Sequence, residues 1–312
     1  MIDSINDVII IGSGPAGYTA AIYLGRAGIK PVLISGLLDS GGALMNTGLV
    51  ENYAGFPDGI PGPELMQNMQ SQAKKFNTDI LVDDVIEVDF ASDIKTLTLS
   101  DNSILKTKAV IVTTGAKYRH LGVLGEDEFA GKGVSYCATC DGFFFKDKAV
   151  AVVGGGDTAV GEAIFLSSLA SKVTIIHRRD QLRATATIAA KAKSIPNIEF
   201  AWDSIVEEVK GDDAGVKSLE LKNVHSLAKS QIDCSGVFVA IGHNPSTGIF
   251  RGKLKLNDLG YVIVNSPSTA TSQLGVFAAG DCVDSKYRQA IIAAASGAKA
   301  ALDVDEFLKG VV

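Results

Sequence analysis

The sequence predicts an α/β protein built on two Rossmann-like units, and three observations support this prediction. An apolar strand pattern, D-V-I-I-I-G, leads into the loop G-S-G-P-A-G at Gly12 to Gly17, and a helical pattern follows it. The same order of strand, glycine loop and helix returns at Gly154 with G-G-G-D-T-A. Both copies reach the end of their next strand, at Ser35 and His177, after the same number of residues.

Composition limits the remaining possibilities. The chain has 312 residues, of which 46% are hydrophobic, and a formal net charge of -6, as expected for a soluble protein of about two domains. An acidic balance disfavours nucleic acid as a partner, because phosphate binding needs a basic face. No apolar run approaches the roughly 20 residues that span a membrane, and the first residues lack a signal-peptide pattern. We therefore expect a cytoplasmic protein without membrane contact.

Further elements follow from the pattern between and after the two units. Strand-like segments fill residues 80 to 112 and end in A-V-I-V-T-T-G-A. After the second unit come more strand-like pieces and V-F-V-A-I-G-H-N-P at 237 to 245, whose Asn-Pro indicates a boundary. We expect linkers near Lys117 to His120 and near His243 to Ser246.

Each glycine loop has the spacing that brings a pyrophosphate to a helix N-terminus. The first glycine allows the tight turn, the second allows the phosphate to approach the backbone, and the third position lets helix and strand pack closely. These positions are Gly12, Gly14 and Gly17 in the first loop and Gly154, Gly156 and Ala159 in the second. One such loop is weak evidence, but two of them, each between a strand and a helix, predict two nucleotide sites.

The residues after the next strand indicate which nucleotide binds. A carboxylate there accepts hydrogen bonds from a ribose 2′-hydroxyl, but the second unit has His177, Arg178 and Arg179, with Arg183 four residues on. Guanidinium groups pair with a 2′-phosphate, so the prediction is NADPH rather than NADH. The first unit has Ser35 there and its spacing names no nucleotide. FAD is the expected occupant, because a hydride from NADPH reaches a dithiol through a flavin.

The motif C-A-T-C-D at 137 to 141 carries a pair of cysteines, Cys137 and Cys140. A zinc site needs four ligands, and the other cysteines and histidines are scattered singly, so no metal is expected. A structural disulfide is disfavoured, because so short a loop constrains little of the unfolded chain. The interpretation that remains is a pair that alternates between dithiol and disulfide, with Asp141 as candidate general acid.

With these residues in hand, the sequence resembles the low-molecular-weight bacterial thioredoxin reductases from about Asp7 to Leu308. The motifs that carry the resemblance are C-A-T-C-D-G-F, V-V-G-G-G-D-T-A, H-R-R-D, V-F-V-A-I-G-H-N-P, G-V-F-A-A-G-D and Y-R-Q-A. Four positions depart from the common pattern of that family: Ala43 replaces a glutamine, Gly161 a glutamate and Thr113 an alanine, and Cys282 follows Asp281 where other residues are usual. We expect Cys282 to be an inert buried thiol.

The resemblance implies two Rossmann-like (three-layer ββα) nucleotide-binding domains. An FAD domain would comprise residues 1–116 and 246–312, and an NADPH domain that carries the dithiol, residues 117–245, would be inserted between them. A homodimer and thioredoxin as the protein substrate are implied as well. Cys140 would face the flavin and Cys137 would attack the partner.

The resemblance also implies the cofactor contacts. For FAD these are Gly12, Ser13, Gly14, Pro15, Ala16, Gly17, Gly41, Gly42, Asn52, Thr114, Gly115, Gly280, Asp281, Arg288, Gln289 and Ala290. For NADPH they are Gly154, Gly156, Asp157, Thr158, His177, Arg178, Arg179 and Arg183.

The expected reaction is a relay from NADPH through flavin to the cysteine pair and then to a protein disulfide. Because the pair must meet both the flavin and a bulky substrate, we expect the inserted domain to rotate about its two linkers. Three alternatives remain open. The protein could reduce a different acceptor, act as a flavin-dependent dithiol oxidase, or be a redox or zinc-binding regulator without turnover.

Overall fold

The computed structural model describes residues 5–310. The chain forms two compact units. The first runs to Lys117 and resumes at Asn244, and the second comprises Tyr118–His243. The second unit is therefore an insertion in the first, and the two are described in turn.

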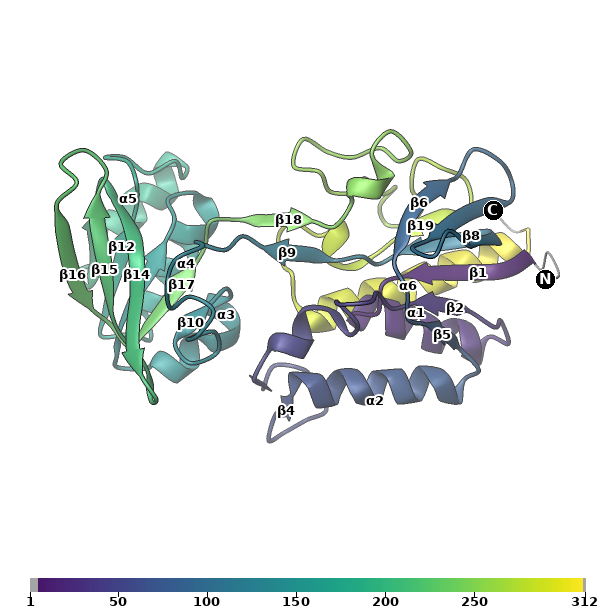
Figure 1. Ribbon diagram of the computed structural model, residues 1–312, viewed down its shortest axis with the longest axis horizontal. Coiled ribbons are helices and arrows are strands. Elements are labelled where there is room, and N and C mark those ends of the chain that lie inside the picture. Colours follow the sequence, from purple (N-terminus) through teal and green to yellow (C-terminus); the bar gives the residue numbers. More distant parts are fainter. Residues whose placement is uncertain (1–4, 311–312) are drawn as a thin grey trace. The chain divides into compact units, whose positions relative to one another are not determined.

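The first unit is built on one mixed sheet (Figure 1). Its parallel strands are β1 (Ile5–Ile11), β2 (Val32–Ile34), β5 (Asp79–Leu81), β8 (Ile104–Val112) and β19 (Val276–Ala278). Its antiparallel strands are β6 (Val85–Asp89) and β7 (Lys95–Leu99). Strand β8 belongs to both parts, because its first half pairs with β7 and its second half with β19.

Three layers result from the alternation of side chains along the central strands. On β1, Val8 and Ile10 pack against the helices, whereas Ile9 and Ile11 pack against the side that holds β6 and β7. The helices of this unit are α1 (Pro15–Arg26), α2 (Gly62–Lys75) and α6 (Ala290–Leu308). Its short elements are η1 (Gly42–Asn46), β3 (Leu49–Val50), β4 (Ile60–Pro61), η3 (Gly248–Phe250) and η4 (Gly280–Cys282).

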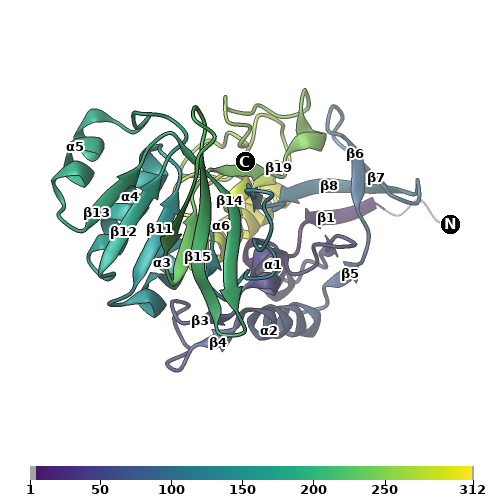
Figure 2. The same cartoon turned by 60° about the vertical axis from the view of Figure 1, so that its left-hand side comes forward.

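The second unit repeats the three layers with a five-stranded parallel sheet (Figure 2). Its strands, in spatial order, are β10 (Val134–Ser135), β17 (Gly236–Val239), β11 (Ala149–Val153), β12 (Lys172–Ile176) and β13 (Ile198–Ala201). One face packs against α3 (Ala138–Asp141), η2 (Gly142–Phe145), α4 (Asp157–Ser167) and α5 (Ala186–Ser194). The other face packs against the antiparallel strands β14 (Ser204–Asp212), β15 (Gly215–Asn223) and β16 (Lys229–Asp233).

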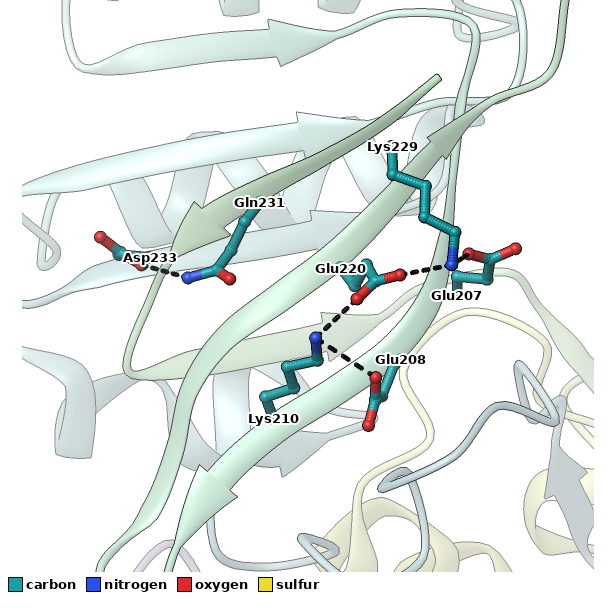
Figure 3. A network of polar contacts seen from close by, with 7 residues as sticks. All are labelled: Glu207, Glu208, Lys210, Glu220, Lys229, Gln231 and Asp233. Atoms are coloured by element: carbon teal, nitrogen blue, oxygen red, sulfur yellow. Dashed lines mark hydrogen bonds and ion pairs between the residues drawn. The ribbon is translucent and has the colours of Figure 1, made fainter. Parts of the chain in front are cut away.

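Charged side chains mark the solvent-facing side of the antiparallel sheet. Glu208 and Glu220 stand opposite each other in the register of β14 and β15, which would be unfavourable for two like charges alone. Lys210 bridges the two carboxylates and Lys229 bridges Glu220 to Glu207 (Figure 3). Hydrogen bonds from both lysines lower the pKa of Glu220 to about 2. This charged network covers the outer face and leaves the apolar face to the core.

Two segments connect the units and pair with each other as β9 (Ala116–Tyr118) and β18 (His243–Pro245). The predicted linkers overlap these connections. The prediction of an α/β protein with two Rossmann-like units is confirmed by the parallel strands at the centre of both sheets. Within residues 5–310, no helix is both long and apolar enough to cross a lipid bilayer.

Candidate active site

The cysteine pair lies where strand β10 ends and the short helix α3 begins. Cys137 is the N-cap residue of α3, and its sulfur is joined to that of Cys140 in a disulfide with the Cα atoms 5.3 Å apart. The carbonyl oxygen of Cys137 accepts hydrogen bonds from the N–H groups of Cys140 and Asp141, at 3.2 and 3.1 Å. The turn is thus closed by backbone bonds as well as by the sulfurs. Cys140 is exposed and Cys137 half-buried.

Asp141 follows the pair at the C-terminal end of α3. Burial raises the pKa of its carboxyl group above the ordinary value, and a hydrogen bond from Ser135 opposes that rise. The Ser135 hydroxyl donates to Asp141 Oδ2 at 2.6 Å. A carboxyl group that retains its proton to higher pH beside a disulfide suits a general acid.

The other two cysteines are buried thiols. Burial raises the pKa of Cys234 and of Cys282 to about 12, so neither forms a thiolate near neutral pH. The expectation that Cys282 is a buried thiol is met, since its exposed fraction is 0%. Thiolate chemistry among the described residues therefore belongs to Cys137 and Cys140.

The first glycine loop has the steric features of a dinucleotide site. A Cβ atom at Gly17 would overlap the carbonyl oxygen of Gly12, so a side chain at Gly17 would prevent the close approach of α1 to the loop. Gly12 has a φ of +110°, in the region that favours glycine. At Gly14, in contrast, an added Cβ atom would have no heavy atom within 4 Å, and no side chain caps the helix at this residue. This space at a helix N-terminus fits a pyrophosphate.

The structure brings several of the predicted flavin contacts to this loop. A Cβ on Gly42 would lie 3.3 Å from Gly14 Cα, and one on Gly280 would lie 3.0 Å from Ala16 Cβ. The Ser13 hydroxyl accepts a hydrogen bond from the N–H of Gly41 at 2.8 Å. These segments, which are more than 260 residues apart at their extremes, lie around one loop.

A second group of predicted flavin contacts meets near the start of α6. The Asn52 side-chain amide donates to Gln289 Oε1 at 3.2 Å, and Ala290 is the first residue of that helix. Arg288 has a φ of +47°. Burial, together with the neighbouring Asp284, raises the pKa of Asp281 to about 6. Thr114 and Gly115 follow Thr113 just after the end of β8, at the same edge of the sheet as the loop.

The second glycine loop lies between β11 and α4. Gly154 has a φ of +149°, and a Cβ atom added at Gly156 would have no heavy atom within 4 Å. No side chain caps α4 at Gly156, just as none caps α1 at Gly14. The side chain of Asp157 does not cap the helix. Its Oδ1 atom accepts a hydrogen bond from the N–H of Thr185 at 2.8 Å, which links the start of α4 to the segment before α5. Thr158 is the second residue of α4.

The residues after β12 divide into a buried and an exposed group. His177 is only 5% exposed, and its ring lies so close to Gly155 that a Cβ there would overlap it. Burial and the positive charges of Arg183, Arg179 and Arg178 lower the pKa of His177, which keeps its ring neutral. The three arginines are exposed and pair with no carboxylate among the described residues. The arginines are thus available to an anion, and His177 supports the loop beneath them.

Sequence reasoning missed three contributors to this geometry. Ser135 carries the hydrogen bond to Asp141, and Tyr136 donates to the buried Glu126 at 3.0 Å. Neither residue belongs to a motif that signals a role. The pairing of Ser13 with the Ser35 carbonyl at 2.8 Å was also not foreseen.

Two dinucleotide-binding loops and a redox-capable cysteine pair define a protein that moves electrons between a nicotinamide nucleotide and a disulfide. The pyridine nucleotide-disulphide oxidoreductase family matches residues 6–297, and the chain belongs to that family.

Similar proteins are thioredoxin reductases along nearly their whole length. The one from Streptomyces coelicolor is 54% identical over 97% of this chain and 94% of its own. The one from Mycolicibacterium smegmatis is 49% identical over 98% and 97%. The crystal structure of thioredoxin reductase from Streptococcus pyogenes is 40% identical and covers 99% of this chain and 100% of its own, with a TM-score of 0.94.

Proposed function

We propose that this protein is an NADPH-dependent thioredoxin-disulfide reductase that uses FAD. The observation that carries the proposal is the Cys137–Cys140 disulfide, which is followed directly by Asp141, a carboxyl group with a raised pKa. The same unit contains the second glycine loop of the chain, and exposed arginines lie next to that loop. The relatives named thioredoxin reductase support thioredoxin as the disulfide substrate.

Each cofactor is assigned to one unit. The unit that contains Gly14, Gly42 and Asn52 suits FAD, because Gly42 lies against Gly14 at a helix N-terminus without a side-chain cap and Asn52 contacts Gln289 just before α6. The unit that comprises Tyr118–His243 suits NADPH, because Arg178 and Arg179 can pair with a 2′-phosphate. When bound, the flavin supplies the route by which two electrons pass from the nicotinamide to the disulfide.

The residues of the chain handle the protons and the sulfur chemistry. Reduction by two electrons breaks the Cys137–Cys140 bond and leaves two sulfurs, one of which takes its proton from Asp141. A thiolate of the pair then attacks the substrate disulfide, and a mixed disulfide forms. The other sulfur of the pair then gives up its proton and resolves the mixed disulfide, which restores the Cys137–Cys140 bond and releases the substrate as a dithiol. The sum is NADPH, a proton and a disulfide converted to NADP⁺ and a dithiol.

The surface next to the cysteine pair supports a protein substrate. Phe143 and Phe144 follow Asp141 and are 67% and 44% exposed. Large apolar side chains that lie in solvent beside a reactive group are typical of a protein-binding surface. We infer that thioredoxin docks on these two rings.

A homodimer is part of the proposal and is supported by helix α6. Its outer face exposes Ile291, Ile292 and Leu302, at 41%, 37% and 55%, and the neighbouring helix α1 exposes Tyr23 at 46%. An apolar stripe on a packed helix suits a contact with a second copy. A cytoplasmic location is proposed because NADPH is supplied there.

The test is an anaerobic titration of the purified yellow protein with NADPH, followed by flavin absorbance and by thiol counting. In the wild type, the flavin bleaches, two thiols appear, and added oxidised thioredoxin is reduced catalytically. In Cys140→Ser, the flavin bleaches but thioredoxin is not reduced. Cys234→Ala removes a buried thiol in the same unit and should retain full turnover. Bleaching without new thiols in the wild type would contradict the proposal.

A further inference from the structure

Ser135 lies at the boundary between the parallel sheet of the second unit and the cysteine pair. It is the last residue of β10, paired in register with Phe238 of β17, and only 5% of it is exposed. Because the sheet fixes its backbone, its hydroxyl group has a defined position two residues before Cys137. The cysteine pair that follows lies in the short helix α3, of which Cys137 is the N-cap residue.

The contacts of this hydroxyl group determine where its single proton points. The N–H of Cys137 donates to Ser135 Oγ at 3.1 Å, so Oγ acts as an acceptor there. Asp141 Oδ2 lies 2.6 Å from Oγ, and the Cys137 carbonyl oxygen lies at 3.4 Å. The shorter contact, made to a carboxyl group, is the stronger one. The chain of donors therefore runs from the Cys137 amide through Ser135 to Asp141.

This direction distinguishes the two oxygens of Asp141. Oδ2 accepts the serine proton, so a neutral carboxyl group carries its own proton on Oδ1. The hydrogen bond also stabilises the ionised form of the carboxyl group and opposes the effect of burial on its pKa. Ser135 thus influences both which oxygen gives up the proton and how readily it does so.

We propose that Ser135 is a positioning residue for proton transfer at the cysteine pair, which holds Asp141 through Oδ2 so that Oδ1 delivers the proton. This inference rests on the proposed function. Two-electron reduction, for which a bound flavin would supply the electrons, would break the Cys137–Cys140 bond, and the Oδ1 proton would move to one of the two sulfurs. The carboxylate that remains stays bonded to Ser135 and is reprotonated from water.

The first experiment measures the rate of disulfide reduction by rapid mixing of the holoenzyme with NADPH, in a double-mutant cycle. Ser135→Ala should lower that rate about tenfold, the equivalent of one hydrogen bond to a charged group. Asp141→Asn should lower it further. Ser135→Ala/Asp141→Asn should match Asp141→Asn alone, because Ser135 acts through the carboxyl group. Ser194→Ala, an exposed serine of α5, is the control and should be unaffected.

The second experiment does not depend on turnover. The infrared carbonyl band of protonated Asp141, identified by its loss in Asp141→Asn, is titrated against pH. Ser135→Ala should move its midpoint to higher pH, since the ionised form loses a hydrogen bond. Ser135→Thr and Ser135→Val have the same shape, and only the threonine keeps the hydroxyl group. The threonine variant should titrate as the wild type does, and the valine variant as Ser135→Ala does.

The outcomes separate this inference from the proposed function. If Asp141→Asn reduces its disulfide at the wild-type rate, Asp141 is not the acid and this inference is overturned, while the proposed function still stands on the appearance of two thiols and the reduction of thioredoxin. If Asp141→Asn is slow but Ser135→Ala is not, or if the two effects are additive, only the role of Ser135 is wrong. Should Ser135→Ala fail to fold, the threonine and valine pair decides, and equal rates in both variants would overturn the inference.

Discussion

The two glycine loops share a backbone geometry but fill the space beneath it in different ways. In the first, Ser13 is the second residue of the loop, and its hydroxyl bonds to the carbonyl oxygen of Ser35. In the second, Gly155 takes that place, and the ring of His177 lies against it. Ser35 and His177 occupy equivalent positions after their strands and are 2% and 5% exposed. In the first unit the larger loop residue, Ser13, accompanies the smaller strand-end residue, Ser35. In the second unit the smaller loop residue, Gly155, accompanies the larger strand-end residue, His177.

The comparison shows which parts of the repeated unit are fixed by the backbone and which can be exchanged. The turn glycine and the open second glycine are common to both loops. The residues beneath and beyond the loop differ, and with them the charge presented to a nucleotide. Five changes test how far this division holds.

The largest effect is expected at Gly17. In Gly17→Ala the methyl group overlaps the Gly12 carbonyl oxygen and lies 2.9 Å from Thr113 Oγ1, so helix α1 must move. The free energy of unfolding should fall by about 3 kcal/mol. Gly14→Ala, where no heavy atom lies within 4 Å, should cost less than about 1 kcal/mol. Urea unfolding of both variants checks this, and equal losses would show that the loop is not fixed by this contact.

The next largest effect concerns the charge beyond the second loop. Arg178→Ala/Arg179→Ala removes two exposed guanidinium groups, each worth about tenfold in affinity for a 2′-phosphate. The Kd for NADPH should rise about a hundredfold while that for NADH stays unchanged. Lys191→Ala, an exposed cation of α5, should change neither. If the Kd values for NADPH and NADH rose by the same factor, the arginines would not recognise the 2′-phosphate.

The exchange between loop and strand end predicts a compensating pair. Gly155→Ser places a side chain against the His177 ring and should lower the free energy of unfolding by about 2 kcal/mol. Adding His177→Ser recreates the arrangement of Ser13 and Ser35 and should recover most of that loss. Denaturant unfolding of the two single variants and the double variant measures the coupling. If the double variant lost as much stability as the two single variants together, the residues at the loop and at the strand end would not compensate for each other.

A smaller effect should appear as pH falls. The pKa of His177 in the folded protein is lowered by burial and by the three arginines, so the unfolded chain takes up a proton before the folded one does. This group therefore contributes stability that is present above its ordinary pKa of 6.5 and lost as pH falls below it. His177→Gln should flatten the pH dependence of the melting temperature below pH 6.5. A profile identical to that of the wild type would indicate that another group titrates.

The smallest effect is expected on helix α4. Gly161 is exposed, and a Cβ there would meet no heavy atom within 4 Å. Gly161→Ala should therefore raise the free energy of unfolding by up to about 1 kcal/mol through helix propensity alone. Thermal unfolding measures the change, and the Kd for NADPH should stay the same. A fall in stability would reveal a constraint on this helix that sterics do not show.

The features that the sequence determined are local ones. A turn glycine, a cysteine pair with two residues between and a cluster of arginines after a strand each express a requirement of one short segment. Backbone sterics and charge impose such requirements wherever the segment lies, so both Rossmann-like units and the redox pair were predictable.

Other features were decided only by the tertiary structure. The hydrogen bond between Asn52 and Gln289 joins residues that are 237 positions apart, and β8 divides its two halves between different partners. Ser135 gains a role only because α3 turns Asp141 back onto the end of β10. Such contacts arise from the packing of whole elements, since a side chain's partners depend on which elements meet and not on its neighbours in sequence. The sequence likewise pointed to His177 as a nucleotide contact, and only the fold shows that its ring lies against Gly155 in the loop.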